Sequence, residues 1–524
     1  MHRTGNCSRR KRAGRVPVGA TAARAGPCAR RSNLLRLRSN QCLAARRAGR
    51  PFGNAPACAC GSVDVDANVS AFVRLIERGA RRRQGTITAK LGEEVRVDPS
   101  LVQQYFHASS TPLAHDLMAL IGAVQFADRA VPRRHATGWA RHLHVELPVY
   151  QLDNWKSAPV SEHLVGCLNY LTGDDWTFSF VARRTEQSNL QQAPLALWST
   201  PPAAFIPYSH GLDSYAQYRL HNENAGAAGI MCVQAATHGQ VSSWKTYCRR
   251  VFGEEVIALA VPVHVQCPHR SEPTFRSRPF GYYLLAAYGA LLAGGAQVLI
   301  PENGQGSLGA SLVPTGDPKH RSCYPGFTKQ LSRFLEKLTR KSIDFYHPAL
   351  FQTKAQVLMQ LEGHGVGLGQ VLAQHWSCSY DSRWAHAEHR KVHCGICGNC
   401  LLRRVAETNA QATGATAYLY ADLSAATLES ATSTLPRAHR ALADVARNSV
   451  RDMQRMADLA ADKDAFIVRS VSADVGRWTG RANADVKRDI GKLLDHHADE
   501  WQSFVADCGR GSWIAEAAKG TYGH

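Results

Sequence analysis

Residues 203–220 read AAFIPYSHGLDSYAQYRL, and this stretch decides the fold. Its apolar run at 203–207 predicts a buried strand, residues 209–214 predict a tight turn, and residues 215–220 predict a helix. A strand, loop and helix in this order direct backbone N–H groups and the positive end of the helix toward one point, where an anion such as phosphate binds. No Gly-Lys-Ser or Gly-Lys-Thr follows, so the loop is not a Walker A motif. An ordinary strand-to-helix turn is the alternative interpretation.

Positive charge is concentrated at the start of the chain. The 524 residues carry a formal net charge of +20. Residues 1–50 contain fourteen Lys and Arg and no Asp or Glu, which leaves about +6 for the remainder and weakens a nucleic-acid interpretation of the charge. Residues 1–60 lack the apolar core of a secretory signal. We interpret them as a basic extension: a disordered arm, a transit-like peptide or, as we favour, the product of a start codon assigned too far upstream.

The composition is typical of a globular protein. Hydrophobic residues make up 44% of the chain and charged residues 20%. The most apolar stretch, residues 282–300, is rich in Gly and Ala and ends in a strand-like VLI, so it predicts a core helix followed by a strand rather than a membrane span. Fifteen cysteines in a large chain without a secretory signal indicate a reducing compartment, and we expect a cytoplasmic protein.

Residues 61–199 predict an α+β N-terminal domain. Amphipathic spacing over residues 101–131 indicates helices that are interrupted at Pro112. Alternating apolar residues at 142–150 and 176–184 indicate two strands.

The rest of the chain predicts two further regions after a linker at residues 187–202. In residues 200–406 strands alternate with helices, which predicts an α/β domain with a parallel sheet and helices on both faces. The later strands are expected at residues 230–235, 255–264 and 297–301, with a helix at 280–293. Ligands bind beyond the carboxyl ends of such strands, where the loop at 209–214 lies. Residues 407–524 are rich in Ala with apolar residues at helical spacing, which predicts a helical region for packing or partner binding.

Three further stretches place charged residues at the ends of predicted strands or helices. Arg276 and Arg278 precede a helix, and two guanidinium groups there suit bidentate binding of phosphate or carboxylate. Glu302 lies in a Pro-Glu-Asn-Gly stretch that ends a strand, and this stretch could contact a base, a ribose or Mg²⁺. Lys354 opens a helix after a His-Pro pair, so its ammonium could lie near a phosphate. Each of these residues alone is more often an exposed charge in water.

The most specific pattern lies at residues 376–404, WSCSYDSRWAHAEHRKVHCGICGNCLLRR. Its cysteines follow the spacing C-x15-C-x2-C-x2-C, at Cys378, Cys394, Cys397 and Cys400. Four thiolates suit tetrahedral Zn²⁺, and the x2 spacings let the chain wrap the ion. An iron–sulfur cluster and a set of buried free cysteines are the alternatives. His386, His389 and His393 could replace a ligand, although four cysteines already complete the set.

Together these motifs resemble the 7-cyano-7-deazaguanine synthase (QueC) family of PP-loop enzymes. The shared motifs are, in this order, SHGLDS at 209–214, TKA at 353–355 and WSC…HCGICGNC at 376–400. The chain is most similar to the longer QueC-like proteins of bacterial Qat-type antiphage defence clusters. That similarity rests on ADRAVPRR at 127–134, LTGDDWTFSF at 171–180 and RSRPF at 276–280. The resemblance covers roughly residues 100–405.

The resemblance implies a Rossmann-like fold of the adenine nucleotide alpha hydrolase type, with ATP, Mg²⁺ and structural Zn²⁺. It implies that a substrate carboxylate, here deazaguanine-like, attacks the α-phosphorus of ATP, that pyrophosphate leaves, and that an amine then displaces AMP. The implied partners are proteins of a defence cluster. The resemblance places ATP at Tyr208, Ser209, His210, Gly211, Leu212, Asp213, Ser214 and Tyr215. It gives catalytic roles to Asp213, Lys354, Arg278 and Glu302.

One residue departs from the family pattern and keeps other functions open. His210 stands where the family has a glycine. The alternative function is therefore a catalytically degenerate QueC-like scaffold or a nucleic-acid-binding zinc protein. Another PP-loop reaction, such as tRNA thiolation, needs a catalytic cysteine pair, and no obvious pair remains once four cysteines bind zinc.

Overall fold

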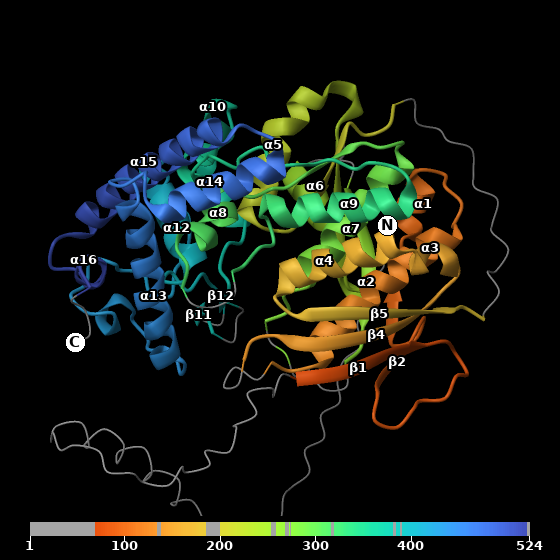
Figure 1. Ribbon diagram of the computed structural model, residues 1–524. Coiled ribbons are helices and arrows are strands. Elements are labelled where there is room, and N and C mark those ends of the chain that lie inside the picture. Colours follow the sequence, from red (N-terminus) through yellow and green to blue (C-terminus); the bar gives the residue numbers. More distant parts are fainter. Residues whose placement is uncertain are drawn as a thin grey trace, which may run out of the picture. The chain divides into compact units, whose positions relative to one another are not determined.

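Two mainly parallel β-sheets and the helices packed against them form the described part of the chain (Figure 1). The computed structural model describes residues 69–133, 138–184, 200–252, 258–267, 272, 274–315, 319–380, 384–387 and 390–520. All of them belong to one compact unit, Asp66–His524. The predicted basic extension and most of the predicted linker lie outside the described residues.

The larger sheet has the strand order β10-β9-β6-β7-β8-β3. Its strands are β3 (Val95–Val97), β6 (Ala204–Pro207), β7 (Ile230–Ala236), β8 (Ala258–Val265), β9 (Gln297–Leu299) and β10 (Phe345–Tyr346). The strands from β10 to β8 pair in parallel, and β3 adds an antiparallel edge. The prediction of an α/β fold with a parallel sheet is therefore confirmed.

The strand order of this sheet reverses at β6. The strands β7 and β8, which follow β6 in the chain, extend to one side of it, whereas the later strands β9 and β10 lie on its other side. Loops that leave two such neighbouring strands diverge to opposite faces of the sheet, and ligands of parallel α/β sheets bind in the crevice between them. The residues that follow β6 and β9 therefore flank the position at which chemistry is expected.

Helices cover both faces of the larger sheet. Helix α7 (Arg278–Leu292) packs against β6, β7 and β9, while α5 (Leu212–Asn222) and α6 (His238–Phe252) pack on the opposite face. Successive residues of β6 divide between two apolar cores, with Phe205 on the α7 side and Ile206 on the α5 side. This division explains why β6 is apolar and buried at every position, as strands covered on both faces are.

The N-terminal strands form a smaller sheet that is entirely parallel. Its order is β2-β1-β4-β5, with β1 (Val69–Ile76), β2 (Ile87–Lys90), β4 (Arg141–Val149) and β5 (Asp175–Ala182). The sequence predicted β4 and β5 but not the helices between them, α3 (Leu152–Lys156) and α4 (Ala158–Thr172). These helices make the crossover that two parallel neighbouring strands require, so the region has parallel β-α-β pairing rather than the antiparallel sheet that an α+β interpretation favours.

Helix α2 (Pro112–Ala130) lies between the two sheets and joins them. After the short helix α1 (Ser100–Tyr105), it packs against β4 of the smaller sheet and against β3 and β8 of the larger sheet. Its side chains are buried at nearly every position from 114 to 128. One apolar core accordingly contains residues from both sides of residue 200. The predicted domain limits at 61–199 and 200–406 stay predictions, and residues of both predicted domains contact one another in this core.

Further helices follow β9 and lead to the end of the chain. They are α8 (Gly304–Leu312), α9 (Pro325–Thr339), α10 (Lys354–Gly363), α11 (Leu368–Gln374), α12 (Gly398–Asn409), α13 (His439–Asp458), α14 (Phe466–Thr479), α15 (Asn483–Cys508) and α16 (Trp513–Ala518). A two-stranded ribbon, β11 (His386–Ala387) and β12 (Arg390–Lys391), and two short 3-10 helices, Glu223–Ala228 and Glu429–Ala431, complete the described elements.

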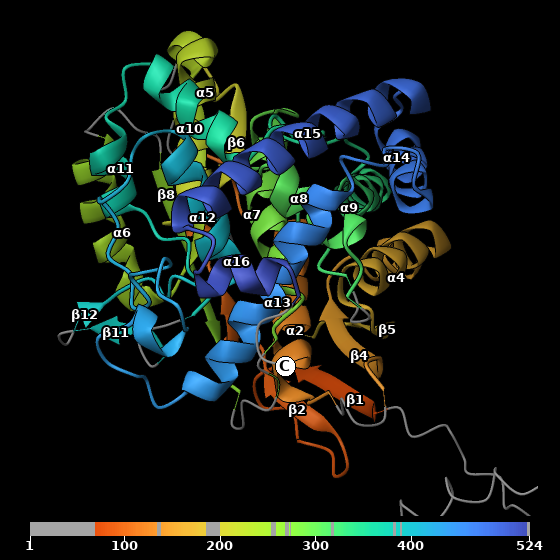
Figure 2. The same cartoon turned by 90° about the vertical axis from the view of Figure 1, so that its left-hand side faces the viewer.

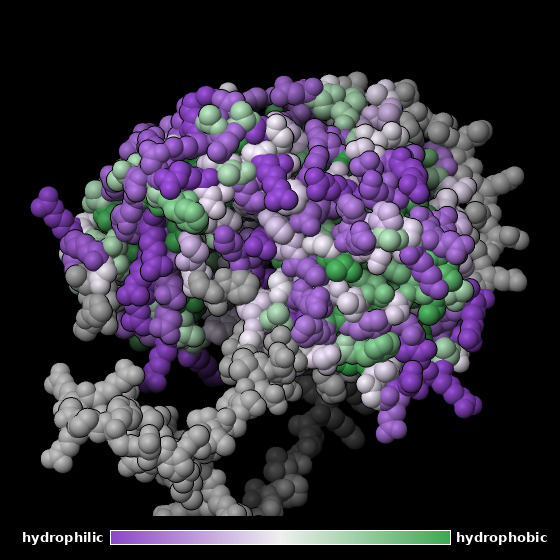
Figure 3. All heavy atoms as spheres, in the orientation of Figure 1, coloured by the Kyte–Doolittle hydropathy of each residue, from purple (hydrophilic) through white to green (hydrophobic). Residues whose placement is uncertain are grey.

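The last four helices pack on the earlier part of the unit, as apolar spacing in this region predicted. Helix α14 contacts α9, while α13 and α15 contact α12 (Figure 2). Helix α13 buries Leu442 and Val450, and its outward side is hydrophilic (Figure 3), with Arg440 and Arg451 exposed. Within the described residues, no helix combines the length and the apolar character needed to cross a membrane.

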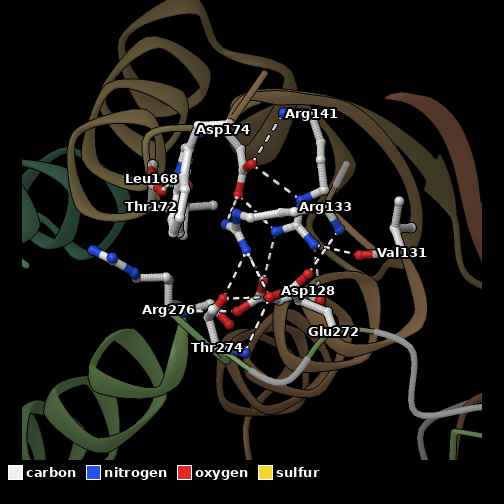
Figure 4. Close-up of polar contacts among 12 residues, drawn as sticks. Asp128, Val131, Arg133, Arg141, Leu168, Thr172, Asp174, Glu272, Thr274 and Arg276 are labelled. Atoms are coloured by element: carbon white, nitrogen blue, oxygen red, sulfur yellow. Dashed lines mark hydrogen bonds and ion pairs between the residues drawn. The ribbon is translucent and has the colours of Figure 1, made fainter. Parts of the chain in front are cut away.

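A buried cluster of charged side chains connects the smaller sheet to the loop before α7 (Figure 4). Its members are Arg133, Arg141, Asp128, Asp174 and Glu272, and their side chains are at most 1% exposed. Arg141 donates from Nε to Asp174 Oδ1 at 3.0 Å and from Nη2 to Asp174 Oδ2 at 2.6 Å. Its Nη2 also donates to Asp128 Oδ1 at 2.6 Å. Arg133 forms ion pairs with Asp174 and, at 3.5 Å, with Glu272.

This ionic cluster reaches the first residues of α7. Asp128 lies near the end of α2, Arg141 begins β4, and the backbone N–H of Ser277, directly before α7, donates to Asp128 Oδ2 at 2.8 Å. The ring of Trp139 is packed by two guanidinium groups, that of Arg133 at 4.7 Å and that of Arg276 at 4.6 Å. The cluster therefore holds the Arg276–Arg278 stretch against the smaller sheet.

Replacing Asp174 with Ala should destabilise the protein strongly. The change leaves two buried guanidinium groups without their shared carboxylate, and breaking a buried charge pair in this way costs about 3–5 kcal/mol. The neighbouring Asp175→Ala is the control, because its side chain is half-exposed and its His142 contact is worth at most about 1 kcal/mol. Free energies of unfolding from urea denaturation measure both changes. Equal losses for the two variants would contradict the role assigned to the cluster.

Candidate functional site

The loop after β6 is closed by two serine hydroxyls. Ser209 Oγ and Ser214 Oγ lie 2.9 Å apart, and the backbone N–H of Ser209 donates to Ser214 Oγ at 3.2 Å. The N–H of Gly211 donates to Ser209 Oγ at 3.1 Å. A Cβ on Gly211 would lie only 2.9 Å from the same oxygen, so glycine permits this close approach. Backbone and hydroxyl donors therefore converge at the start of α5.

Helix α5 begins earlier than the sequence predicted. We expected a turn through residues 209–214, but the helix already begins at Leu212. The reason is a contact from far along the chain: Trp376 N donates to His210 O at 3.0 Å, and Leu212 N donates to Trp376 O at 3.3 Å. This backbone bridge ends the loop at Gly211, so that Asp213 lies in the first turn of the helix.

His210 packs to the side of the loop, against aromatic residues of α6. Its ring centre lies 4.3 Å from that of Tyr247 and 5.6 Å from that of Trp244. Burial lowers the pKa of His210, and the positive charges of Arg250 and Lys391 lower it further. The imidazole is therefore neutral at pH 7, and it contributes no positive charge to this loop.

Four polar side chains from three segments meet beside the loop. Lys354, the first residue of α10, forms an ion pair with Asp213 Oδ1. Asn303, which follows β9, donates from Nδ2 to Asp213 Oδ1 at 3.1 Å and to Glu302 Oε1 at 2.9 Å. The side chain of Lys354 is 5% exposed and that of Asp213 26% exposed. The structure thus brings together three of the four predicted catalytic residues where the strand order reverses.

This polar cluster holds two carboxyl groups beside one ammonium. Burial raises the pKa of Glu302 to about 8, and the nearby charge of Asp213 adds to the shift, whereas Lys354 opposes it. Glu302 therefore holds its proton at pH 7, and a bound cation would favour its ionised form. Carboxylate oxygens are the ligands that hard divalent cations prefer, so Asp213 and Glu302 could hold one.

The fourth predicted catalytic residue, Arg278, is not a partner in these contacts. It is the first residue of α7, and its guanidinium lies 5.7 Å from the ring centre of Tyr282. Burial lowers the pKa of His320 to about 4, and the charges of Arg276 and Arg278 lower it further. Among the residues that the structure describes, Arg278 forms no ion pair with a member of the Asp213–Lys354–Glu302 group.

Sequence reasoning named Asn303 only as part of the Pro-Glu-Asn-Gly stretch and did not single out Tyr283 or Cys323. Asn303 caps α8, because its Oδ1 accepts from Gly306 N at 3.0 Å. An Asn directly before a Gly-rich helix is an N-cap signal that could have identified it. The hydroxyl of Tyr283 lies 3.2 Å from Cys323 Sγ. Burial raises the pKa of Cys323 to about 12, and the charge of Glu302 contributes to the shift.

The four predicted cysteine ligands form a second buried group. Their Sγ atoms all lie within 4.8 Å of one another, and those of Cys394 and Cys400 are 3.8 Å apart. Sulfurs bound tetrahedrally to zinc at about 2.3 Å are themselves about 3.8 Å apart, so the group fits zinc. The N–H groups of Tyr380 and Cys394 donate to Cys378 Sγ at 3.4 Å, and that of Cys397 donates to Cys394 Sγ at 3.3 Å. Such bonds stabilise thiolates, and the cluster can bind a metal ion such as zinc.

Of the three neighbouring histidines, the two that the structure describes do not belong to this ligand set. His393 Nε2 accepts from Ser377 N at 3.1 Å, and its ring stacks on Trp376 at 4.2 Å. His386 is exposed in β11, and His389 lies outside the described residues. The group that the structure places together therefore consists of cysteines alone.

The cysteine segment is attached to the serine loop through Trp376. The indole Nε1 donates to Cys378 O at 2.9 Å, and the backbone of Trp376 pairs with that of His210 and Leu212. The ammonium of Lys391 lies 3.6 Å from the centre of the indole ring. The position of the loop thus depends on the fold of the metal-binding segment.

Comparison of the chain with protein-family models, with curated proteins and with solved structures finds no match. Its function is therefore inferred from the sequence motifs and from the geometry of the two groups described above.

We expect the purified chain to contain one zinc ion, held by the four cysteines. Cys400→Ser removes one thiolate and should reduce the zinc content, measured by elemental analysis, from about one ion per chain to near zero. Cys248→Ser is the matched control, because Cys248 is also buried but lies on α6, outside the cluster. Iron in place of zinc, or equal zinc content in both variants, would contradict this assignment.

Proposed function

We propose that the chain is an ATP-dependent enzyme that activates a carboxylate by adenylation, with a PP-loop fold and a site resembling that of 7-cyano-7-deazaguanine synthases. The observation that carries the proposal is the meeting of the serine loop with Asp213, Lys354 and Glu302 at the reversal of strand order. Backbone and hydroxyl donors, a shielded cation and a pair of carboxylates are the groups that binding of ATP with Mg²⁺ requires.

In this proposal the phosphates of ATP lie on the serine loop. The hydroxyls of Ser209 and Ser214 and the N–H of Gly211, which bond to one another in the structure, would turn to phosphate oxygens. The ammonium of Lys354 would neutralise the charge that develops on the departing pyrophosphate. Asp213 and Glu302 would hold Mg²⁺, which supplies further charge neutralisation when bound.

The proposed reaction has two steps. A carboxylate oxygen of the substrate attacks the α-phosphorus of ATP, and the bond from that phosphorus to the pyrophosphate oxygen breaks. An amine then attacks the carbonyl carbon of the acyl-adenylate, AMP leaves, and the amine proton passes to water, so that an amide forms without an oxidant or reductant. The proposed substrate is a deazaguanine-like carboxylate, and the amine is ammonia or belongs to a partner protein.

The proposed role of zinc is structural. Four cysteine ligands would complete a tetrahedral zinc site and would leave no open position for a substrate or water. The backbone contacts of Trp376 fix the serine loop from which α5 begins. In this proposal the zinc-bound cysteine segment therefore serves to hold that loop in place.

We expect the full chain with ATP, Mg²⁺ and 7-carboxy-7-deazaguanine to release pyrophosphate, and Asp213→Asn to lower the rate at least 100-fold. The substitution removes one proposed metal ligand and the negative partner of Lys354. A coupled pyrophosphate assay measures the rate. Asp153→Asn is the matched control, because Asp153 is an exposed carboxylate on α3, and its rate should equal that of the wild type.

Three results would favour the degenerate-scaffold alternative instead. They are the absence of ATP binding, ATP binding without pyrophosphate release for every carboxylate offered, and release that appears only after His210→Gly. Tight binding of RNA or DNA that survives removal of residues 1–60 would favour a nucleic-acid-binding zinc protein.

A further inference from the structure

Helix α15 near the end of the chain reaches back to the candidate site. Glu500 and His497 lie three positions apart on this helix and therefore on one face, and both are buried. They contact the start of α10, where Lys354 lies, and the start of α8. The family resemblance does not extend to α15, and sequence analysis predicted only packing or partner binding there.

The first contact joins Glu500 to the residue before Lys354. Thr353 is the N-cap of α10, and its hydroxyl accepts from Gln356 N at 3.1 Å while it donates to Glu500 Oε1. The Gln356 side chain accepts from Thr353 N at 2.9 Å, which completes a capping box. Among the described residues, Glu500 Oε2 has no hydrogen-bond partner, so Thr353 is the group to which this buried carboxyl is bound.

The second contact is a relay of hydrogen bonds that ends on the backbone of Lys354. The N–H of Lys354 donates to Gln305 Oε1 at 2.8 Å. Gln305 Nε2 lies 2.8 Å from His497 Nδ1, and His497 Nε2 lies 2.9 Å from Met453 O. Because a carbonyl oxygen only accepts, Nε2 carries the proton and Nδ1 accepts from Gln305. The imidazole is therefore neutral, as its complete burial favours.

The same helix also packs closely against the backbone of α8. A Cβ added to Gly304 would lie 2.8 Å from Leu493 Cδ2 and 2.4 Å from Leu350 O. Glycine at this position thus lets α15 approach the helix that carries Gln305. Side-chain packing and two hydrogen-bonded contacts together determine where α10 begins.

We propose that Glu500 and His497 are positioning residues that hold Lys354 against Asp213, and that the C-terminal helix is therefore part of the catalytic unit. A lysine side chain has four rotatable carbon–carbon bonds, so the ammonium is placed only if the backbone from which it extends is fixed. Small displacements of a charged group that acts on the reacting atoms cost large factors in rate. The catalytic meaning of this proposal rests on the proposed function, whereas the contacts with Lys354 do not.

Two substitutions at Glu500 separate its hydrogen bond from its charge. Burial raises the pKa of Glu500 to about 7; the hydrogen bond from Thr353 lowers it and the charge of Asp499 raises it. Glu500→Gln retains an oxygen that accepts from Thr353 and resembles the protonated acid. Glu500→Ala removes the acceptor. Phe504→Leu is the control for a general loosening of α15, because Phe504 is buried one turn later in the core of the cysteine segment.

The test measures Lys354 itself, by the rate at which acetic anhydride acetylates it in the full chain, read by mass spectrometry. We expect Glu500→Ala to raise this rate at least fivefold and to lower kcat for pyrophosphate release at least tenfold, with KM for ATP changed less than threefold. Glu500→Gln and Phe504→Leu should stay within twofold of the wild type. If Glu500→Ala does not fold, Gln305→Met cuts the second contact with little change in volume and should have the same effects.

The proposal is overturned if the acetylation rate of Lys354 in Glu500→Ala stays within twofold of the wild type, or if Phe504→Leu raises it equally. It is also overturned if Glu500→Gln behaves like Glu500→Ala, because the hydrogen bond would then not be the cause. A wild-type chain that releases no pyrophosphate would refute the proposed function alone. The acetylation rates would still decide whether α15 positions Lys354.

Discussion

The ion pair between Lys354 and Asp213 joins residues that are 141 positions apart and determines where helices α5 and α10 meet. An ammonium that is 5% exposed requires a negative partner, because an unpaired buried charge costs several kcal/mol. Both residues lie in the first turn of their helices, so the pair also brings two helix N-termini toward one point. Positive helix ends and their unbonded N–H groups favour an anion, and the strand-order reversal opens the sheet at the same place.

Two groups of buried charge in this molecule differ in the partners that their cations have. In the ionic cluster, Arg141 alone donates to two carboxylates and two backbone carbonyls. The neighbouring Arg133 binds the same two carboxylates. These contacts stabilise a fixed arrangement of α2, β4 and the loop before α7. In the candidate site one ammonium faces two carboxyl groups, and burial beside Asp213 raises the pKa of Glu302 to about 8. Perturbed carboxyl groups of this kind gather at functional sites, where a ligand or ion supplies the missing charge. The first group therefore explains the fold, and the second indicates function.

Local patterns in the sequence predicted the elements, whereas contacts between distant residues determined the site. An apolar run predicted β6, a Thr-Lys-Ala helix start after a His-Pro pair predicted α10, and the cysteine spacing predicted the cysteine group, because each signal is contained in nearby residues. The start of α5 at Leu212 was missed because it depends on Trp376. Asn303 and Asp213 are 90 positions apart, and Gln305 and His497 are 192 apart. No local pattern encodes such partners.

The serine loop and the start of α10 are both weakly stabilised by their own packing, which explains why distant segments are bound to them. A short loop of small and polar residues buries little apolar surface, and the first turn of a helix has N–H groups without partners inside the helix, so neither is held in place by packing alone. In this chain the loop is fixed by the backbone of Trp376 beside the cysteine group, and the start of α10 is fixed by Gln305, Glu500 and His497. The cysteine segment and α15 also share one apolar core. A substitution in either segment can therefore shift the positions of Asp213 and Lys354 without altering a direct contact of these residues. The last third of the chain is thus a determinant of the site's geometry.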